Sequence, residues 1–172
     1  MFRFIAAVAA SMVFLVGCAS HSDAIPEVDF AQMMIPHHEQ AIVMSDLALA
    51  NNAGPEVSAL AVAISAAQEP EIEQMRGIIA RYGAEEVHSH GDHDMPGMLT
   101  EAQLDELGRA SGPEFDRLFL TGMIEHHKGA IVMAEEVLGS DDAEVRSLAE
   151  QIIREQEREI VEMEALLKQQ QP

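Results

Sequence analysis

Apolar residues recur every three to four positions through most of the chain, which is the period of an amphipathic helix. Clusters of Gly, Pro, Asn and Asp interrupt this pattern and mark where helices end. Thr100 and Gln103 form a capping-box signature at the start of a short helix. No stretch alternates apolar and polar residues for long enough to favour a strand. The sequence therefore predicts an all-α chain with helices at about residues 29–50, 55–82, 100–109, 113–138 and 141–168.

The long helices form a duplicated pair. Residues 34–44 recur 89 positions later as residues 123–133, with eight of the eleven letters identical. The second and fourth long helices also match each other, through six positions at a constant offset of 88. Two helix pairs, at about 29–82 and 113–169, predict an antiparallel four-helix bundle in which the loop 83–99 and the short helix form the crossover.

The amino-terminal residues have the layout of a secretory signal. A short basic start precedes an apolar run over residues 4–16, and small residues follow before Cys18. Residues 15–18 resemble the bacterial lipobox, in which the signal is removed and the cysteine carries the lipid. An ordinary cleaved signal with a cysteine nearby is the alternative. We therefore expect three parts, namely a signal peptide at 1–17, a lipidated Cys18 with a tether at 18–28, and the bundle domain at 29–172.

Charge and cysteine content limit the partners of the domain. Without Arg3 of the signal, the chain has 9 basic against 30 acidic side chains, a formal charge of −21. Nucleic acid is a poor partner because binding it needs a positive surface, whereas cations are attracted. Because Cys18 is the only cysteine, the exported domain has no internal disulfide and no thiolate metal site.

The repeated stretch places imidazole and thioether groups on one helix face. At about 100° per residue, the first histidine of each repeat shares a stripe with the two methionines. The second histidine falls on the flank, so we expect His37 and His126 to point most directly into the bundle. Four imidazoles inside a small bundle are hard to explain as packing. We therefore interpret the set as a metal site made of Met34, His37, His38, Met44, Met123, His126, His127 and Met133.

The second helix of each pair adds polar residues to its apolar face. Burying a carboxylate without a partner costs several kcal/mol, so it needs a proton, a hydrogen bond or a cation. We expect these residues to orient the histidines or to act as additional ligands. They are Gln68, Glu71 and Met75, and their repeats Gln156, Glu159 and Met163.

The ligand types favour copper. Thioether and imidazole together suit Cu(I) best, and imidazole alone also suits Cu(II) or Zn. Taken singly, however, each methionine is more readily a core residue than a ligand, and a single inward histidine is usually a hydrogen-bonded core residue. A second candidate metal site lies in the crossover loop, although Gly- and Asp-rich loops also collect histidine without a function. It comprises His88, His90, His93, Met95 and Met98.

At the histidine repeats the chain resembles the family called domain of unknown function 305, a group of exported ferritin-like four-helix bundles. The resemblance covers about residues 30–167 and rests on the two histidine repeats, on Phe115-Asp116 before the second repeat, and on the two Gln/Glu/Met triplets. It implies a ferritin-like fold. Some members resemble copper-binding proteins of the cell envelope that contribute to copper tolerance, which nominates the repeated methionines and histidines here.

The two repeats depart from perfect symmetry inside the motif. Pro36 stands against Glu125, and Gln40 stands against Gly129. We therefore expect the two half-sites to bind a metal unequally.

The expected function is that of an exported, lipid-anchored protein of the bacterial cell envelope that binds copper for sequestration, tolerance or delivery. Its expected partners are a metal ion, the membrane through the anchor, and an envelope protein or a second copy. The alternative is an acidic interaction module with a polar histidine core. A di-metal oxidase is less favoured, because the Glu-x-x-His spacing that it needs occurs only at Glu85 and His88. We expect no enzymatic activity.

Overall fold

The computed structural model describes residues 25–86 and 95–170. This part of the chain contains helices and no strand, which confirms the predicted fold class. None of its helices is long and apolar enough to cross a membrane. The helices are α1 (Pro26–Ala50), α2 (Pro55–Arg81), α3 (Glu101–Arg109), α4 (Pro113–Glu135) and α5 (Ala143–Gln169).

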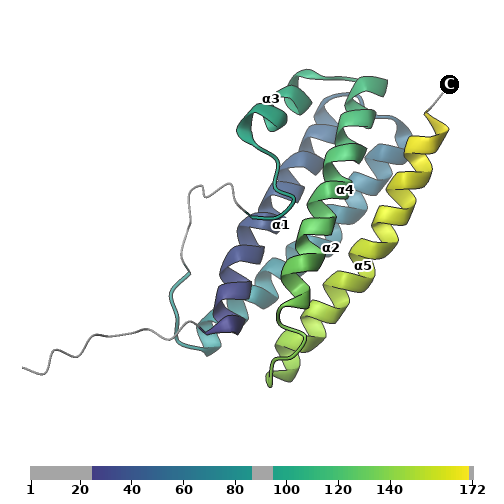
Figure 1. Ribbon diagram of the computed structural model, residues 1–172. Coiled ribbons are helices and arrows are strands. Elements are labelled where there is room, and N and C mark those ends of the chain that lie inside the picture. The colour runs from purple at the N-terminus through teal and green to yellow at the C-terminus, as the bar shows by residue number, and fades with distance from the viewer. Residues whose placement is uncertain (1–24, 87–94, 171–172) are drawn as a thin grey trace, which may run out of the picture.

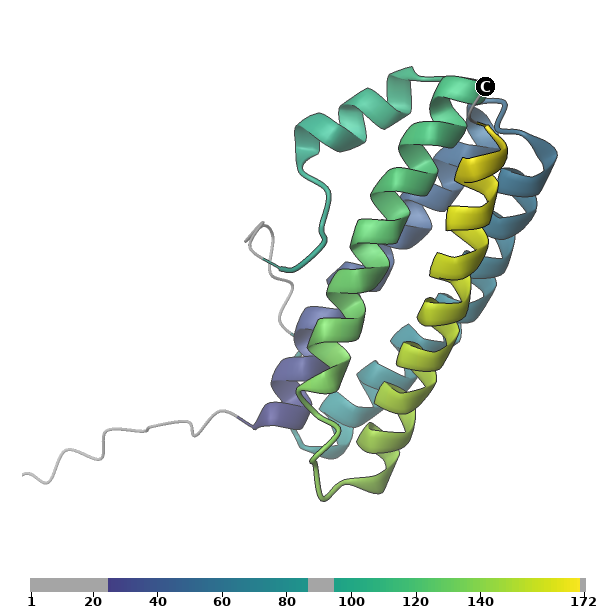
Figure 2. The same ribbon diagram turned by 45° about the vertical axis from the view of Figure 1, so that its right-hand side comes forward.

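Four long helices form the bundle (Figure 1). α1 packs closely on α2 and α4 packs closely on α5, and the two pairs meet mainly through α1 and α4. Neighbouring helices are antiparallel, and the connection from α2 to α4 runs back along the bundle with α3 standing at one side (Figures 1 and 2). One long crossover between two helix pairs is the topology of a ferritin-like bundle.

The helix ends follow local chemistry. α1, α2 and α4 each begin with proline in the first turn, where its missing N–H costs no hydrogen bond. α1 therefore begins at Pro26, three residues before the expected start. α3 has the predicted capping box between Thr100 and Gln103. The connection after α4 is longer than expected, because Asp142 accepts hydrogen bonds from the first amides of α5 and fixes its start at Ala143.

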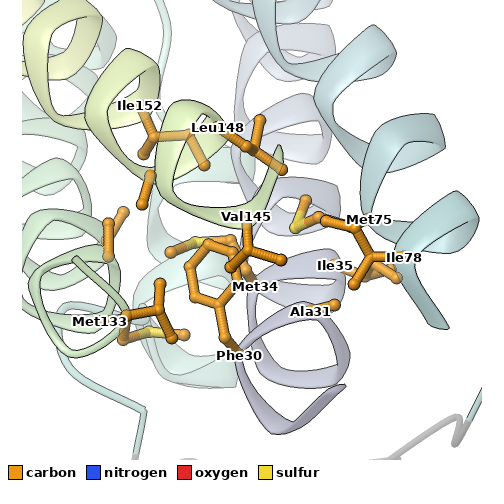
Figure 3. Packing of buried hydrophobic residues seen from close by; sticks show 14 of the residues in the cluster. Phe30, Ala31, Met34, Ile35, Met75, Ile78, Met133, Val145, Leu148 and Ile152 are labelled. Carbon is orange, nitrogen blue, oxygen red and sulfur yellow. The ribbon is translucent and has the colours of Figure 1, made fainter. Parts of the chain in front are cut away.

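The apolar core is divided into two clusters by a layer of polar side chains. On each long helix, buried apolar residues lie before and after the polar positions. One cluster contains Met34, Met75 and Met133 (Figure 3). The other contains the repeat equivalents of these three methionines, Met123, Met163 and Met44. Residues that are equivalent in the two repeats thus lie on opposite sides of the polar layer, so the layer lies at the centre of the internal symmetry.

Candidate metal centre

Eight polar side chains form the layer between the two apolar clusters. The four histidines of the repeats are 0% exposed, and the four Gln and Glu side chains of α2 and α5 are 2–3% exposed. The prediction that these residues face inward is confirmed. The expectation that His37 and His126 point inward more directly than His38 and His127 is not, because all four imidazoles are equally buried. The layer consists of His37, His38, Gln68, Glu71, His126, His127, Gln156 and Glu159.

Two histidines form hydrogen-bonded pairs with the buried glutamates. His38 Nε2 lies 2.9 Å from Glu71 Oε2, and His127 Nε2 lies 2.7 Å from Glu159 Oε2. The second oxygen of Glu71 accepts a hydrogen bond of 3.2 Å from the side chain of Gln151. Each glutamate thus holds the histidine on the neighbouring helix of its own pair. Helix geometry placed the second histidine of each repeat on the flank of its helix. In the structure this flank faces α2 at His38 and α5 at His127.

The other two histidines meet each other between α1 and α4. The ring centroids of His37 and His126 are 3.9 Å apart, with an angle of 40° between the ring planes. His37 Nε2 donates a hydrogen bond of 2.9 Å to the backbone carbonyl of Pro96 in the crossover. The backbone of His37 lies near the His126 ring but outside hydrogen-bond geometry. Neither ring nitrogen of His126 therefore has a hydrogen-bond partner among the described residues.

Many buried polar atoms of the layer have no hydrogen-bond partner within residues 25–86 and 95–170. They include the Nδ1 atoms of all four histidines, His126 Nε2, and both amide atoms of Gln68 and Gln156. Buried polar groups are normally paired. A histidine that is held through one nitrogen by an oxygen atom, with the other nitrogen open, has the arrangement of a metal ligand. The residues present therefore fit a metal ion that imidazole prefers.

Burial keeps the imidazoles of His37, His38 and His126 neutral. It lowers the pKa of His37 to about 4 and that of His38 to about 3, with smaller contributions from neighbouring charges. Burial also lowers the pKa of His126 well below its usual range, and raises the pKa of Glu71 to about 7. The contact between His38 and Glu71 is therefore a hydrogen bond to a neutral ring and not an ion pair. Neutral imidazole is the form that binds metals.

Oxygen and nitrogen donors alone do not form a preassembled site in the described ranges 25–86 and 95–170. No group of three or more His, Asp or Glu side chains converges there in a metal-binding arrangement. The further donors near the layer are the thioethers of the two methionine trios, which are 0–4% exposed. The assignment of these methionines and histidines as ligands stays a prediction.

The loop candidate is only partly visible. His88, His90 and His93 lie outside the described residues, as does Cys18. Met95 packs against the first apolar cluster, whereas Met98 lines a groove of ≈ 270 Å³ between the crossover, α3 and α4.

Sequence reasoning missed the part that the crossover plays at the layer. The contact between His37 and Pro96 involves a backbone carbonyl, which no side-chain pattern reveals. The side chain of Gln40 also holds the backbone of Leu99. The only signal in the sequence was the mismatch of Gln40 with Gly129 in the repeat.

One motif residue has a structural role. Asp116 is 8% exposed, and its carboxylate accepts hydrogen bonds of 3.0 and 3.2 Å from the backbone amide of Gly54. It joins the start of α4 to the turn between α1 and α2, away from the histidines.

Comparison with solved structures gives several close matches in fold. A putative secreted DUF305 protein from Streptomyces coelicolor is 30% identical, with a TM-score of 0.79, over 84% of this chain and 93% of that chain. A DUF305 fragment from Deinococcus radiodurans is 32% identical, with a TM-score of 0.79, over 85% of this chain and 97% of that chain. CopM in its Cu(I)-bound form is 32% identical, with a TM-score of 0.71, over 83% of this chain and 96% of that chain.

CopM has also been solved with Cu(II) and with Ag bound. No functionally curated protein matches the chain. The family model described as domain of unknown function (DUF305) matches residues 27–167. The chain therefore belongs to the DUF305 family.

Proposed function

We propose that this protein binds copper, with Cu(I) favoured, in the polar layer of its bundle, and that it serves copper sequestration, tolerance or delivery in the bacterial cell envelope. The observation that carries the proposal is the set of four buried imidazoles, whose Nδ1 atoms have no hydrogen-bond partner in the part of the chain that the structure describes. The similarity to CopM, a protein that holds Cu(I), Cu(II) and Ag in solved structures, supports metal binding in general.

The chemistry of the layer suits a soft ion of low charge. Neutral imidazole and thioether are donors that select Cu(I) over harder cations. Glu71 and Glu159 hold His38 and His127 through Nε2, which leaves Nδ1 as the ligating atom and increases its basicity. Because Glu71 has a pKa near 7, it loses a proton readily when a cation binds nearby, and its negative charge offsets that of the ion.

A Cu(I) titration against a competing chelator tests the proposal. We expect the purified protein to retain copper, and we expect the double variant His126→Ala/His127→Ala to bind at least tenfold more weakly, because each lost ligand also leaves a partner unpaired. The matched control is the triple variant His88→Ala/His90→Ala/His93→Ala, which leaves the bundle intact. Loss of binding in the control alone would assign the metal to the loop. If neither the variants nor the wild type bind Cu(I), the alternative function, an acidic protein-interaction module, is favoured.

We also propose that residues 1–17 are a signal peptide and that Cys18 carries a lipid anchor. This rests on the resemblance of residues 15–18 to a lipobox. A protein held by two or more acyl chains partitions to membranes, because each buried methylene contributes about 0.8 kcal/mol. Cell fractionation should find the wild type in membranes and Cys18→Ser in the soluble fraction. Unchanged membrane association of the variant would rule out the anchor.

A further inference from the structure

A backbone segment of the crossover lies over the face where His37 and His126 meet. We call residues 95–99 the crossover strap. The side-chain amide of Gln40 holds it at one end through two hydrogen bonds, since Leu99 N donates to Gln40 Oε1 at 2.7 Å and Gln40 Nε2 donates to Leu99 O at 3.0 Å. These bonds use both the donor and the acceptor of one amide, so Gln40 acts as a clamp on Leu99.

The strap also lies directly on α4. A Cβ atom at Gly129 would come within 1.8 Å of the carbonyl oxygen of Pro96, and a Cβ atom at Gly97 would come within 2.3 Å of the carbonyl oxygen of Glu125. Gly97 has a φ of +79°, which L side chains rarely adopt. Absence of a side chain at Gly129 thus lets the strap approach close enough for Pro96 to accept the hydrogen bond from His37.

These contacts explain one of the positions at which the repeat loses its symmetry. The two halves differ at Gln40 against Gly129. Gln40 binds the strap at Leu99, and the missing side chain of Gly129 leaves space for the strap at Pro96. A symmetric bundle would need neither residue, because only one crossover passes over the α1–α4 face. The difference between Gln40 and Gly129 therefore serves the strap.

The outer edge of the strap borders open space. Gly97, Met98 and Leu99 line the groove of ≈ 270 Å³ between the strap, α3 and α4. The figures show α3 and the segment before it at one side of the bundle (Figures 1 and 2). The strap is thus held on its inner side by His37, Gln40 and α4, with the groove on its outer side.

We propose that the crossover strap is a latch over the His37–His126 face, that Gln40 holds it closed, and that ligands reach these two imidazoles when it opens. Gln40 is a positioning residue, because it contacts the strap and not the ligand. Loss of its two hydrogen bonds increases the open population roughly tenfold, since each neutral hydrogen bond contributes modestly to stability.

Chemical modification of the imidazoles in metal-free protein tests the latch without any metal. A reagent that carbethoxylates accessible histidines is applied to the full chain, and the rate at each histidine is measured by peptide mass spectrometry. We expect Gln40→Ala to accelerate modification of His37 and His126 about tenfold, while His38 and His127 stay protected behind them. The matched control is Gln32→Ala, which removes a glutamine of the same helix that donates to the backbone carbonyl of Glu85.

A second variant opens the latch by a different route. Gly129→Ala places a methyl group against the carbonyl of Pro96, while alanine favours the helix by about 1 kcal/mol over glycine. It should therefore accelerate modification of the same two histidines without loss of fold. The control Gly77→Ala makes the same exchange in α2, where a Cβ atom meets nothing within 4 Å. Rates within twofold of the controls, or an equal rise at all four histidines, would overturn the latch.

The metal arm of the test rests on the proposed function. We expect Gln40→Ala to raise the association and dissociation rates of Cu(I) together by about tenfold, with the dissociation constant within threefold of wild type. Faster modification of His37 and His126 with unchanged association and dissociation rates of Cu(I) would contradict the proposal that copper enters when the strap opens. If wild-type protein holds no copper, the proposed function fails, and the modification rates still decide whether the latch exists.

Discussion

His38 and His127 each form a side-chain hydrogen bond to a buried glutamate, and this bond orients the ring. His38 and His127 are held through Nε2 by a buried glutamate, and Nδ1 of each ring is buried without a hydrogen-bond partner in the described part of the chain. Burial lowers the pKa of His38 to about 3, so the His38 ring is neutral in its pair with Glu71, which avoids the cost of an isolated internal charge on that ring. Under the proposed function, Nδ1 is the atom that binds the metal.

Replacing the glutamate by its amide tests this role. Glu71→Gln keeps the size of the side chain but removes the charge that offsets a bound cation, so we expect Cu(I) affinity to fall by about tenfold. Chelator competition measures the change. The control is Glu73→Gln, which removes an exposed carboxylate from the same helix. Equal affinities for the two variants would show that Glu71 has no part in binding.

At the scale of elements, the helices and their inward faces could be predicted because helix periodicity is a local property. The wheel placed Gln68 and Glu71 on the buried face, and the structure buries both. It could not show that Glu71 meets His38, because that pairing depends on how α1 and α2 cross. Nor could it show the contact of Pro96 with His37, because a backbone carbonyl has no signature in the sequence.

Asp116 belongs to the sequence motif, but its role is to join the start of α4 to the turn between α1 and α2. Asp116→Ala leaves the amide of Gly54 without its acceptor, so we expect the free energy of unfolding to fall by about 2 kcal/mol. Cu(I) affinity of the folded protein should stay unchanged. Denaturant unfolding and chelator competition measure the two quantities. Asp105→Ala removes an exposed carboxylate of α3 and serves as the control; a loss of affinity in Asp116→Ala alone would contradict a purely structural role.

At the scale of the molecule, the polar layer couples stability to pH. The pKa of His37 falls to about 4 in the folded chain, against about 6.5 when unfolded. The unfolded state therefore binds more protons between these values, and stability is lost as pH falls from 6.5 to 4. Glu71 acts in the opposite sense, because its folded pKa near 7 means that its contribution is lost as pH rises from 4.5 to 7.

Three buried imidazoles with lowered pKa outweigh this one carboxyl. His37 alone corresponds to about 3 kcal/mol over its range. We therefore expect the metal-free protein to lose stability steeply between pH 6.5 and 4, as measured by urea unfolding at several pH values. The double variant His37→Gln/His126→Gln should show a shallower dependence. A flat profile for the wild type, or identical slopes, would contradict neutral histidines in the folded layer.

The division of the core by a polar layer is the feature that unites fold and proposed function. Two apolar clusters with three methionines each stabilise the bundle on either side of the histidines. The sequence predicted the repeated residues but not this division, because it depends on the antiparallel placement of all four helices. The same placement puts three buried methionines in the cluster on each side of the layer.

X-ray absorption at the copper edge tests the central claim most directly. The sample is the variant His88→Ala/His90→Ala/His93→Ala loaded with Cu(I). Within residues 25–172 this variant keeps only the four histidines of the repeats. We predict a spectrum with both imidazole nitrogen and thioether sulfur as ligands. Copper bound without imidazole, or no copper retained at all, would contradict a metal site in the polar layer.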